Sequence, residues 1–267
     1  MRDSRRKVKL QLDPQVASGY SSGAQIARRV TEQWGAENLY CLACSSRTLE
    51  AATANTAVLD FLCPQCAAAY QLKAKNGRFG RKVANSAYAV KVAAIDAGTV
   101  PNYLFLGYSR TDWEVRDLFV VPGHFVTRAV VEERPRLPDT ARRAGWIGSN
   151  ILLHALPAEA RLELVNSGRI VPVTAVRRQW RAFAFLNTDP RAGGGWAADV
   201  LACVRDFQKD SGDQFTLAEF YARYEQHLSE LHPKNRNVRP KMRQQLQVLR
   251  DGGVIAFFGH GRYRVLG

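Results

Sequence analysis

Four cysteines stand in two closely spaced pairs, and their spacing is typical of a metal site. Cys41 and Cys44 form one Cys-x-x-Cys pair, Cys63 and Cys66 form the other, and 18 residues separate the pairs. Zn²⁺ prefers four tetrahedral ligands, and two intervening residues allow both sulfur atoms of a pair to bind one ion. The alternative is a set of buried free thiols. Because four thiolates leave no coordination position for water, the spacing predicts a structural Zn²⁺ in a reducing compartment.

An acid, an amide and a lysine form a second group of residues that could carry out chemistry. Asp60 lies in a strand-like run, residues 57–62, and Gln71 and Lys73 follow in another. Alternate residues of a strand share one face, so Gln71 and Lys73 point the same way. The arrangement resembles the PD-(D/E)xK nucleases, whose acids hold Mg²⁺ while the lysine activates or orients a water. Alone, the motif is short enough to occur by chance on a solvated strand edge.

The segments around these residues predict a mixed α/β domain with the cysteine module, residues 41–66, inserted into it. A basic loop at residues 76–81 separates the module from the later elements. Hydrophobic periodicity and β-branched or aromatic content locate these elements. We expect helices at residues 23–34 and 84–97, and strands at residues 102–108, 115–121 and 161–165.

A change of pattern near residue 190 predicts a second domain. Residues 187–195, which include Pro190 and three consecutive glycines at 193–195, are typical of a linker. After it we expect helices at residues 196–207, from Thr216 onward and at 238–250, then strands at 254–258 and 263–266. Thr216 and Glu219 have the spacing of a capping box. Three helices followed by a hairpin predict a winged helix-turn-helix, so we expect domains at residues 1–190 and 191–267.

The charge distribution points to a polyanionic partner. Lys and Arg total 38 against 24 Asp and Glu, and residues 232–267 carry eight of the basic residues with one acid, Asp251. Phosphates attract such surfaces, and a recognition helix presents Arg and Gln to the major groove. The alternative is a basic solvated face. We expect double-stranded DNA to contact Asn235, Arg236, Asn237, Arg239, Lys241, Arg243, Gln244 and, on the wing, Arg262.

From residue 41 onward the chain resembles the DpnI family of methyladenine-dependent restriction endonucleases. The cysteine quartet, Asp60, the Gln71-Leu-Lys73 run, residues 141–148 and residues 243–251 carry the resemblance. It implies a type II, Mg²⁺-dependent enzyme that cuts duplex GATC carrying N6-methyladenine, with both domains reading the site. It also implies that Arg142, Arg143 and Trp146 contact DNA, with Trp146 as the apolar wall beside the methyl group. From its type alone, Trp146 would be a core residue.

One position departs from the family pattern and keeps a rival hypothesis open. The family places Glu where this chain has Gln71, and an amide oxygen brings no negative charge to a metal. Some related nucleases of the Mrr type use QxK, so an active enzyme is our first interpretation. The rival is a catalytically silent reader of methylated DNA or a transcription regulator. A zinc-ribbon RNA-binding protein is disfavoured, because the winged helix favours duplex.

Nothing in the sequence predicts a membrane protein. No apolar run approaches the ~20 residues that a membrane span needs, and no apolar segment resembles a secretory signal. We therefore expect a cytoplasmic bacterial protein that is a monomer in solution.

Overall fold

The computed structural model of the chain describes residues 8–53 and 59–266. These residues form two compact units, and each unit is built from three separate segments of the chain. The first unit comprises residues up to 80, 101–123 and 160–181, and the second comprises 81–100, 124–159 and 182 onward.

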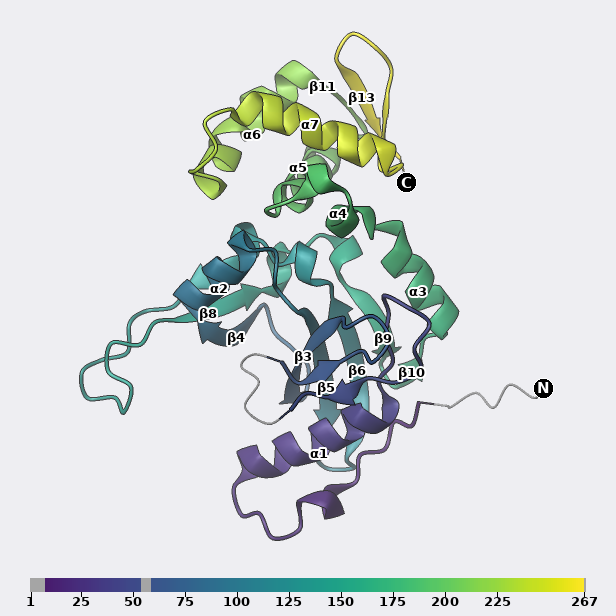
Figure 1. Cartoon of the computed structure of the whole chain (residues 1–267), viewed down its shortest axis with the longest axis vertical. Coiled ribbons are helices and arrows are strands. Elements are labelled where there is room, and N and C mark those ends of the chain that lie inside the picture. Colours follow the sequence, from purple (N-terminus) through teal and green to yellow (C-terminus); the bar gives the residue numbers. More distant parts are fainter. Residues whose placement is uncertain (1–7, 54–58, 267) are drawn as a thin grey trace, which may run out of the picture. The chain divides into compact units, whose positions relative to one another are not determined.

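A seven-stranded mixed sheet is the centre of the first unit (Figure 1). Its strands, in spatial order, are β1 (Glu50–Ala51), β2 (Phe61–Leu62), β3 (Ala69–Asn76), β5 (Asn102–Ser109), β6 (Glu114–Val121), β9 (Leu162–Asn166) and β10 (Arg169–Ile170). β3 and β5 are parallel, and the other neighbours are antiparallel. The predicted strands at 102–108, 115–121 and 161–165 are confirmed within one residue. Of the predicted run 57–62, residues 57 and 58 lie outside the described residues, and Asp60 directly precedes β2.

Helix α1 (Gly23–Asn38) packs closely on this sheet, and one glycine sets the distance. Val30 and Trp34 bury one side of the helix in the core. A Cβ atom at Gly35 would lie 2.6 Å from the ring of Phe61, the first residue of β2. A larger residue at position 35 would therefore push α1 away from the chain next to Asp60.

The second unit contains a smaller antiparallel sheet of β4 (Lys82–Ala87), β8 (Gly148–Leu152) and β7 (Val131–Glu133). Helix α2 (Tyr88–Asp96) follows β4 directly. The predicted helix at 84–97 is therefore wrong in its first four residues. Pairing with β8 holds these residues extended, and a local preference for helix yields to such tertiary hydrogen bonds.

The C-terminal part of the second unit has the predicted three helices and hairpin. Its helices are α5 (Trp196–Ser211), α6 (Leu217–Leu231) and α7 (Val238–Asp251), and its sheet has the order β11 (Gln214–Thr216), β13 (Arg262–Val265), β12 (Ile255–Phe257). The capping box is confirmed, because Thr216 Oγ1 accepts from Glu219 N and Glu219 Oε2 accepts from Thr216 N, at 3.2 and 2.7 Å. Cys203, the fifth cysteine of the chain, is buried in α5.

Two helices fall outside the sequence predictions. Helix α3 (Val173–Ala182) follows β10, and the short α4 (Phe185–Thr188) overlaps the start of the predicted linker. Pro190–Ala192 forms a 3-10 turn that Asp189 caps at Arg191 N. No helix in the described part of the chain is long and apolar enough to cross a membrane.

Candidate functional site

The four predicted cysteine ligands lie together in the first unit. Their sulfur atoms are all within 4.8 Å of one another. Cys41 Sγ lies 3.6 Å from Cys66 Sγ, and Cys44 Sγ lies 3.5 Å from Cys63 Sγ. Four thiolates around a zinc ion at about 2.3 Å would stand about 3.8 Å apart. The cluster therefore fits a metal ion such as zinc.

Helix α3 holds the cysteine module in place through one side chain. The Arg177 guanidinium donates to the carbonyl oxygens of Cys41 and Ser46, at 2.8 and 2.7 Å. Ser46 N in turn donates to Cys44 Sγ at 3.4 Å. Because both carbonyls belong to the turn that carries the first cysteine pair, Arg177 fixes the shape of that turn.

A buried tyrosine joins the cysteine module to β3. Tyr70 Oη accepts a hydrogen bond from Leu42 N at 3.1 Å and lies 3.4 Å from Cys41 Sγ. Tyr70 is fully buried and immediately precedes Gln71. Alternation along the strand sends Tyr70 and Gln71 to opposite faces. The cysteine module therefore supports, from one face, the strand whose other face carries Gln71 and Lys73.

The structure brings Asp60 to the same strand. Asp60 N donates to Tyr70 O at 3.0 Å, and Asp60 Oδ2 accepts from Leu72 N at 2.7 Å. Leu72 is the residue between Gln71 and Lys73. The carboxylate is thus fixed beside the Gln-x-Lys run by backbone atoms alone.

Partial burial and mutual charge shape the electrostatics of Asp60 and Lys73. Burial raises the pKa of Asp60, while the Leu72 N–H and the Lys73 ammonium oppose this rise. Burial lowers the pKa of Lys73, and the Asp60 carboxylate opposes that change. An acid and a base that are both partly dehydrated and within reach of each other are typical of a catalytic site.

Gln71 carries an unsatisfied polar atom. Its Oε1 is buried and has no hydrogen-bond partner among the described atoms. Buried carbonyl oxygens normally have a partner, and an amide oxygen is a suitable ligand for a hard cation such as Mg²⁺. Because the Asp60 carboxylate is held at the next backbone N–H, that of Leu72, a carboxylate and an amide oxygen are available here as ligands that fit a divalent cation.

Two charged residues of α1 affect the pKa of Asp60 and were missed from sequence. Glu32 raises the pKa of Asp60 and Arg28 lowers it. Arg28 Nε and Glu32 Oε1 form an ion pair at 2.7 Å. Their spacing of four residues indicates one helix face. Nothing in the sequence indicates that this face lies near Asp60, because that depends on the packing of α1 against β2.

Arg142, Arg143 and Trp146, the DNA contacts that the resemblance implies, lie in the loop that joins β7 and β8, residues 134–147, here named the β7–β8 loop. Arg142 and Arg143 are exposed, and Trp146 is half-buried. The Arg143 guanidinium lies 4.6 Å above the Trp146 ring. A Cβ atom at Gly148 would lie 2.6 Å from the same ring. Trp146 thus packs over a glycine and under an arginine, and its indole is not fully enclosed in a core.

Backbone hydrogen bonds close the β7–β8 loop on itself. Leu137 N donates to Trp146 O at 3.0 Å, and Gly145 N donates to Leu137 O at 3.1 Å. Gly145 has a φ of 77°, in the left-handed region that glycine adopts readily. The turn before Trp146 therefore has a defined shape.

Most of the predicted DNA-contacting residues of the C-terminal region are accessible. Arg236, Asn237, Arg239, Arg243 and Arg262 are exposed, and Asn235 and Gln244 are half-buried. Lys241 differs, because its Nζ donates to Arg191 O and Gln244 Oε1, at 3.0 and 2.8 Å. Burial also lowers the pKa of Lys241. In this structure Lys241 joins α7 to the segment before α5.

A groove runs along the exposed side of α7. It has a volume of about 390 Å³. Arg239, Arg243 and Gln247 recur every four residues and so share one helix face. The groove is lined by Tyr221, Arg239, Pro240, Arg243, Gln244 and Gln247.

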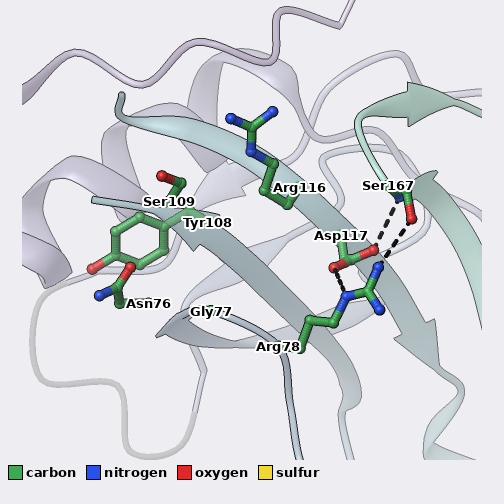
Figure 2. Close-up of a pocket in the computed structure, with 8 residues that line it drawn as sticks. All are labelled: Asn76, Gly77, Arg78, Tyr108, Ser109, Arg116, Asp117 and Ser167. Carbon is green, nitrogen blue, oxygen red and sulfur yellow. Dashed lines mark hydrogen bonds and ion pairs between the residues drawn. The ribbon is translucent and has the colours of Figure 1, made fainter. Parts of the chain in front are cut away.

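A second pocket lies in the first unit at the ends of β3 and β5 (Figure 2). Arg78 reaches Asp117 Oδ2 at 3.5 Å and Ser167 Oγ at 3.2 Å, and Ser167 N donates to Asp117 Oδ1 at 3.0 Å. None of the residues predicted to act in catalysis or metal binding lines it. Arg78 and Asp117 pair with each other, and Arg116 pairs with Asp112 and Glu114, which is typical of a structural ion-pair network.

Comparison with family models gives two matches that together follow the chain. Residues 8–189 match DpnI, described as the Dam-replacing family. Residues 193–265 match DpnI_C, described as the Dam-replacing HTH domain. These matches confirm the resemblance to the DpnI family that the sequence indicates. The chain therefore belongs to the DpnI, or Dam-replacing, family and carries that family's HTH domain at residues 193–265.

Proposed function

We propose that the chain is a Mg²⁺-dependent endonuclease of the PD-(D/E)xK type that cuts duplex GATC sites carrying N6-methyladenine. The family is that of DpnI, and the HTH domain indicates DNA binding. The observation that carries the catalytic part is the hydrogen bond from Leu72 N to Asp60 Oδ2 at 2.7 Å, which fixes the acid beside Gln71 and Lys73.

Asp60 and Gln71 would hold Mg²⁺ through their side-chain oxygens. When bound, the ion would polarise the scissile phosphate and lower the pKa of a water. Lys73 is partly buried next to Asp60, and burial favours its neutral form. Its Nζ would orient the attacking water and share in removing its proton. Glu32 would supply a further negative charge near Asp60. This charge would favour a cation at a site whose second ligand, Gln71, is a neutral amide.

We assign a structural Zn²⁺ to Cys41, Cys44, Cys63 and Cys66. All four positions of a tetrahedral site are filled by sulfur, so no position remains for a substrate. Its role would be to hold the segment that leads to Asp60 and, through Tyr70, the strand β3.

DNA reading would fall to the second unit. Trp146 offers an aromatic face beside exposed Arg142 and Arg143, which suits an apolar methyl group next to a phosphate backbone. The exposed side of α7 would enter the major groove. The proposal also includes a domain boundary near residue 190, between a nuclease domain at residues 1–190 and a winged-helix domain at residues 191–267.

A catalytically silent reader of methylated DNA is the second candidate, and Gln71 favours it. A neutral ligand lowers the affinity for Mg²⁺. A cleavage assay on a methylated duplex oligonucleotide over a range of Mg²⁺ concentrations distinguishes the two. The proposal expects cleavage that Lys73→Ala abolishes, whereas binding without cleavage at any Mg²⁺ concentration supports the silent reader.

A further inference from the structure

Arg239, the second residue of α7, is held by a carboxylate from the neighbouring helix. Arg239 Nε lies 2.9 Å from both carboxylate oxygens of Glu225, and Nη2 lies 2.9 Å from Glu225 Oε2. One edge of the guanidinium, formed by Nε and Nη2, is thereby occupied. The side chain nevertheless remains 61% exposed, so its remaining N–H groups are open to solvent.

An aromatic ring supports the same arginine from below. The Arg239 guanidinium carbon lies 5.4 Å from the centre of the Tyr221 ring. Tyr221 Oη also donates to the backbone carbonyl of Arg239 at 3.2 Å. Tyr221 and Glu225 are four residues apart on α6, so one face of α6 provides both contacts.

This arrangement leaves one edge of the Arg239 guanidinium available to a ligand. A guanidinium is a planar fork, and engagement of the Nε–Nη2 edge leaves the outer edge, Nη1 and the second N–H of Nη2, free. Guanine is the base whose major-groove edge offers two acceptors, O6 and N7, to such a fork. The first residues of a recognition helix are those that reach base edges.

We infer that Arg239 reads a guanine in the major groove and that Glu225 is a positioning residue that holds its guanidinium for this contact. The inference rests on the proposed function, since it requires that α7 binds duplex DNA. Fixing a long side chain before binding removes part of the entropy cost of ordering it on the base. The alternative is an ion pair that only joins α6 to α7.

The test measures guanine recognition with the full chain and no added Mg²⁺, so that the DNA stays intact. One duplex carries a single methylated GATC, and a second carries 7-deazaguanine in place of its guanine on both strands. Loss of N7 removes one of two hydrogen bonds, so the wild type should bind the second duplex about 3- to 10-fold more weakly. Arg239→Ala and Arg239→Lys should lower this ratio toward one, because neither can form the bidentate contact.

Glu225→Gln should also lower the ratio although Arg239 is still present. Glu230→Gln is the matched control, because Glu230 is exposed on the same helix and pairs with Gln226. It should keep the wild-type ratio. An affinity ratio in Arg239→Ala that equals the wild-type ratio overturns the inference. So does a Glu225→Gln protein whose affinity falls by the same factor for both duplexes, because its ratio is then unchanged. An unmethylated duplex measured in parallel tests the proposed function separately.

Discussion

Asp60 Oδ2 accepts a hydrogen bond from Leu72 N at 2.7 Å, which places the acid beside a strand residue flanked by Gln71 and Lys73. The bond uses the backbone of β3, so it does not depend on the side chain of Leu72. It also means that the position of Asp60 depends on the segments that precede and support β3, namely the cysteine module and Tyr70.

Loss of Asp60 or Lys73 should abolish cutting while DNA binding survives. Asp60→Asn removes the negative charge at the metal, and Lys73→Met removes the group that orients water. Each should lower the single-turnover cleavage rate about 100-fold or more. Binding to the methylated duplex should change little, because the predicted DNA-contacting residues lie elsewhere. Glu50→Gln, an exposed acid upstream of Asp60, is the control. Wild-type cleavage by either Asp60→Asn or Lys73→Met would refute the assignment.

Sequence alone identified those parts of the site that rest on local spacing. The Cys-x-x-Cys pairs and the alternation of Gln71 and Lys73 need only short segments of regular chain. The capping box at Thr216 and the helix predicted at residues 238–250 are local in the same sense, and the structure confirms them. Such features are decided within one or two turns or strands.

The remaining features depend on contacts distant in sequence. Glu32 reaches the neighbourhood of Asp60 because Gly35 allows α1 to approach Phe61. Arg177 reaches the cysteine module across 136 residues, from a helix that no sequence pattern had predicted. Lys241 looks like an exposed cation of a recognition helix until the carbonyl of Arg191 is placed beside its Nζ. None of these pairings has a signal in the local sequence.

Gln71→Glu should lower the Mg²⁺ concentration needed for half-maximal cleavage. The change adds one negative charge at the buried oxygen that now has no partner, and hard cations favour charged oxygen ligands. Glu32→Gln should act in the opposite direction, because it removes a negative charge near Asp60. The measurement is the cleavage rate as a function of Mg²⁺ concentration for both variants. If Gln71→Glu leaves both the rate and the Mg²⁺ dependence unchanged, position 71 does not touch the metal.

Disruption of the cysteine cluster should release one zinc ion per chain and destabilise the first unit. Cys44→Ser removes one of the four sulfur ligands, and metal binding is linked to local folding. Elemental analysis should give one zinc for the wild type and for Cys203→Ala, whose thiol lies in α5 of the second unit and is not one of the four clustered thiols. It should give substantially less for Cys44→Ser. Pure, active wild-type protein without zinc would contradict the assignment.

His124 should make the second unit less stable in acid. Burial lowers its pKa from the ordinary 6.5 to about 4, and its Nε2 has no hydrogen-bond partner among the described atoms. Between these pH values the unfolded chain takes up a proton that the folded chain does not. The free energy of unfolding should therefore fall as the pH drops from 6.5 toward about 4, by a contribution on the order of 3 kcal/mol.

Replacement of His124 by leucine should flatten this part of the pH profile. Denaturant unfolding at several pH values between about 4 and 7 measures the effect. His227→Gln, at an exposed position on α6, is the control and should keep the wild-type slope. An equal slope in His124→Leu and wild type would show that His124 is not the group responsible.

We expect this chain to cut DNA only where GATC carries N6-methyladenine. Mg²⁺-dependent digestion of one plasmid, prepared with and without adenine methylation at GATC, measures this dependence. The wild type should cut the methylated form at GATC and leave the unmethylated form intact, and Lys73→Met should cut neither. Equal cutting of both forms, or an intact methylated plasmid at every Mg²⁺ concentration with the wild type, would contradict this expectation.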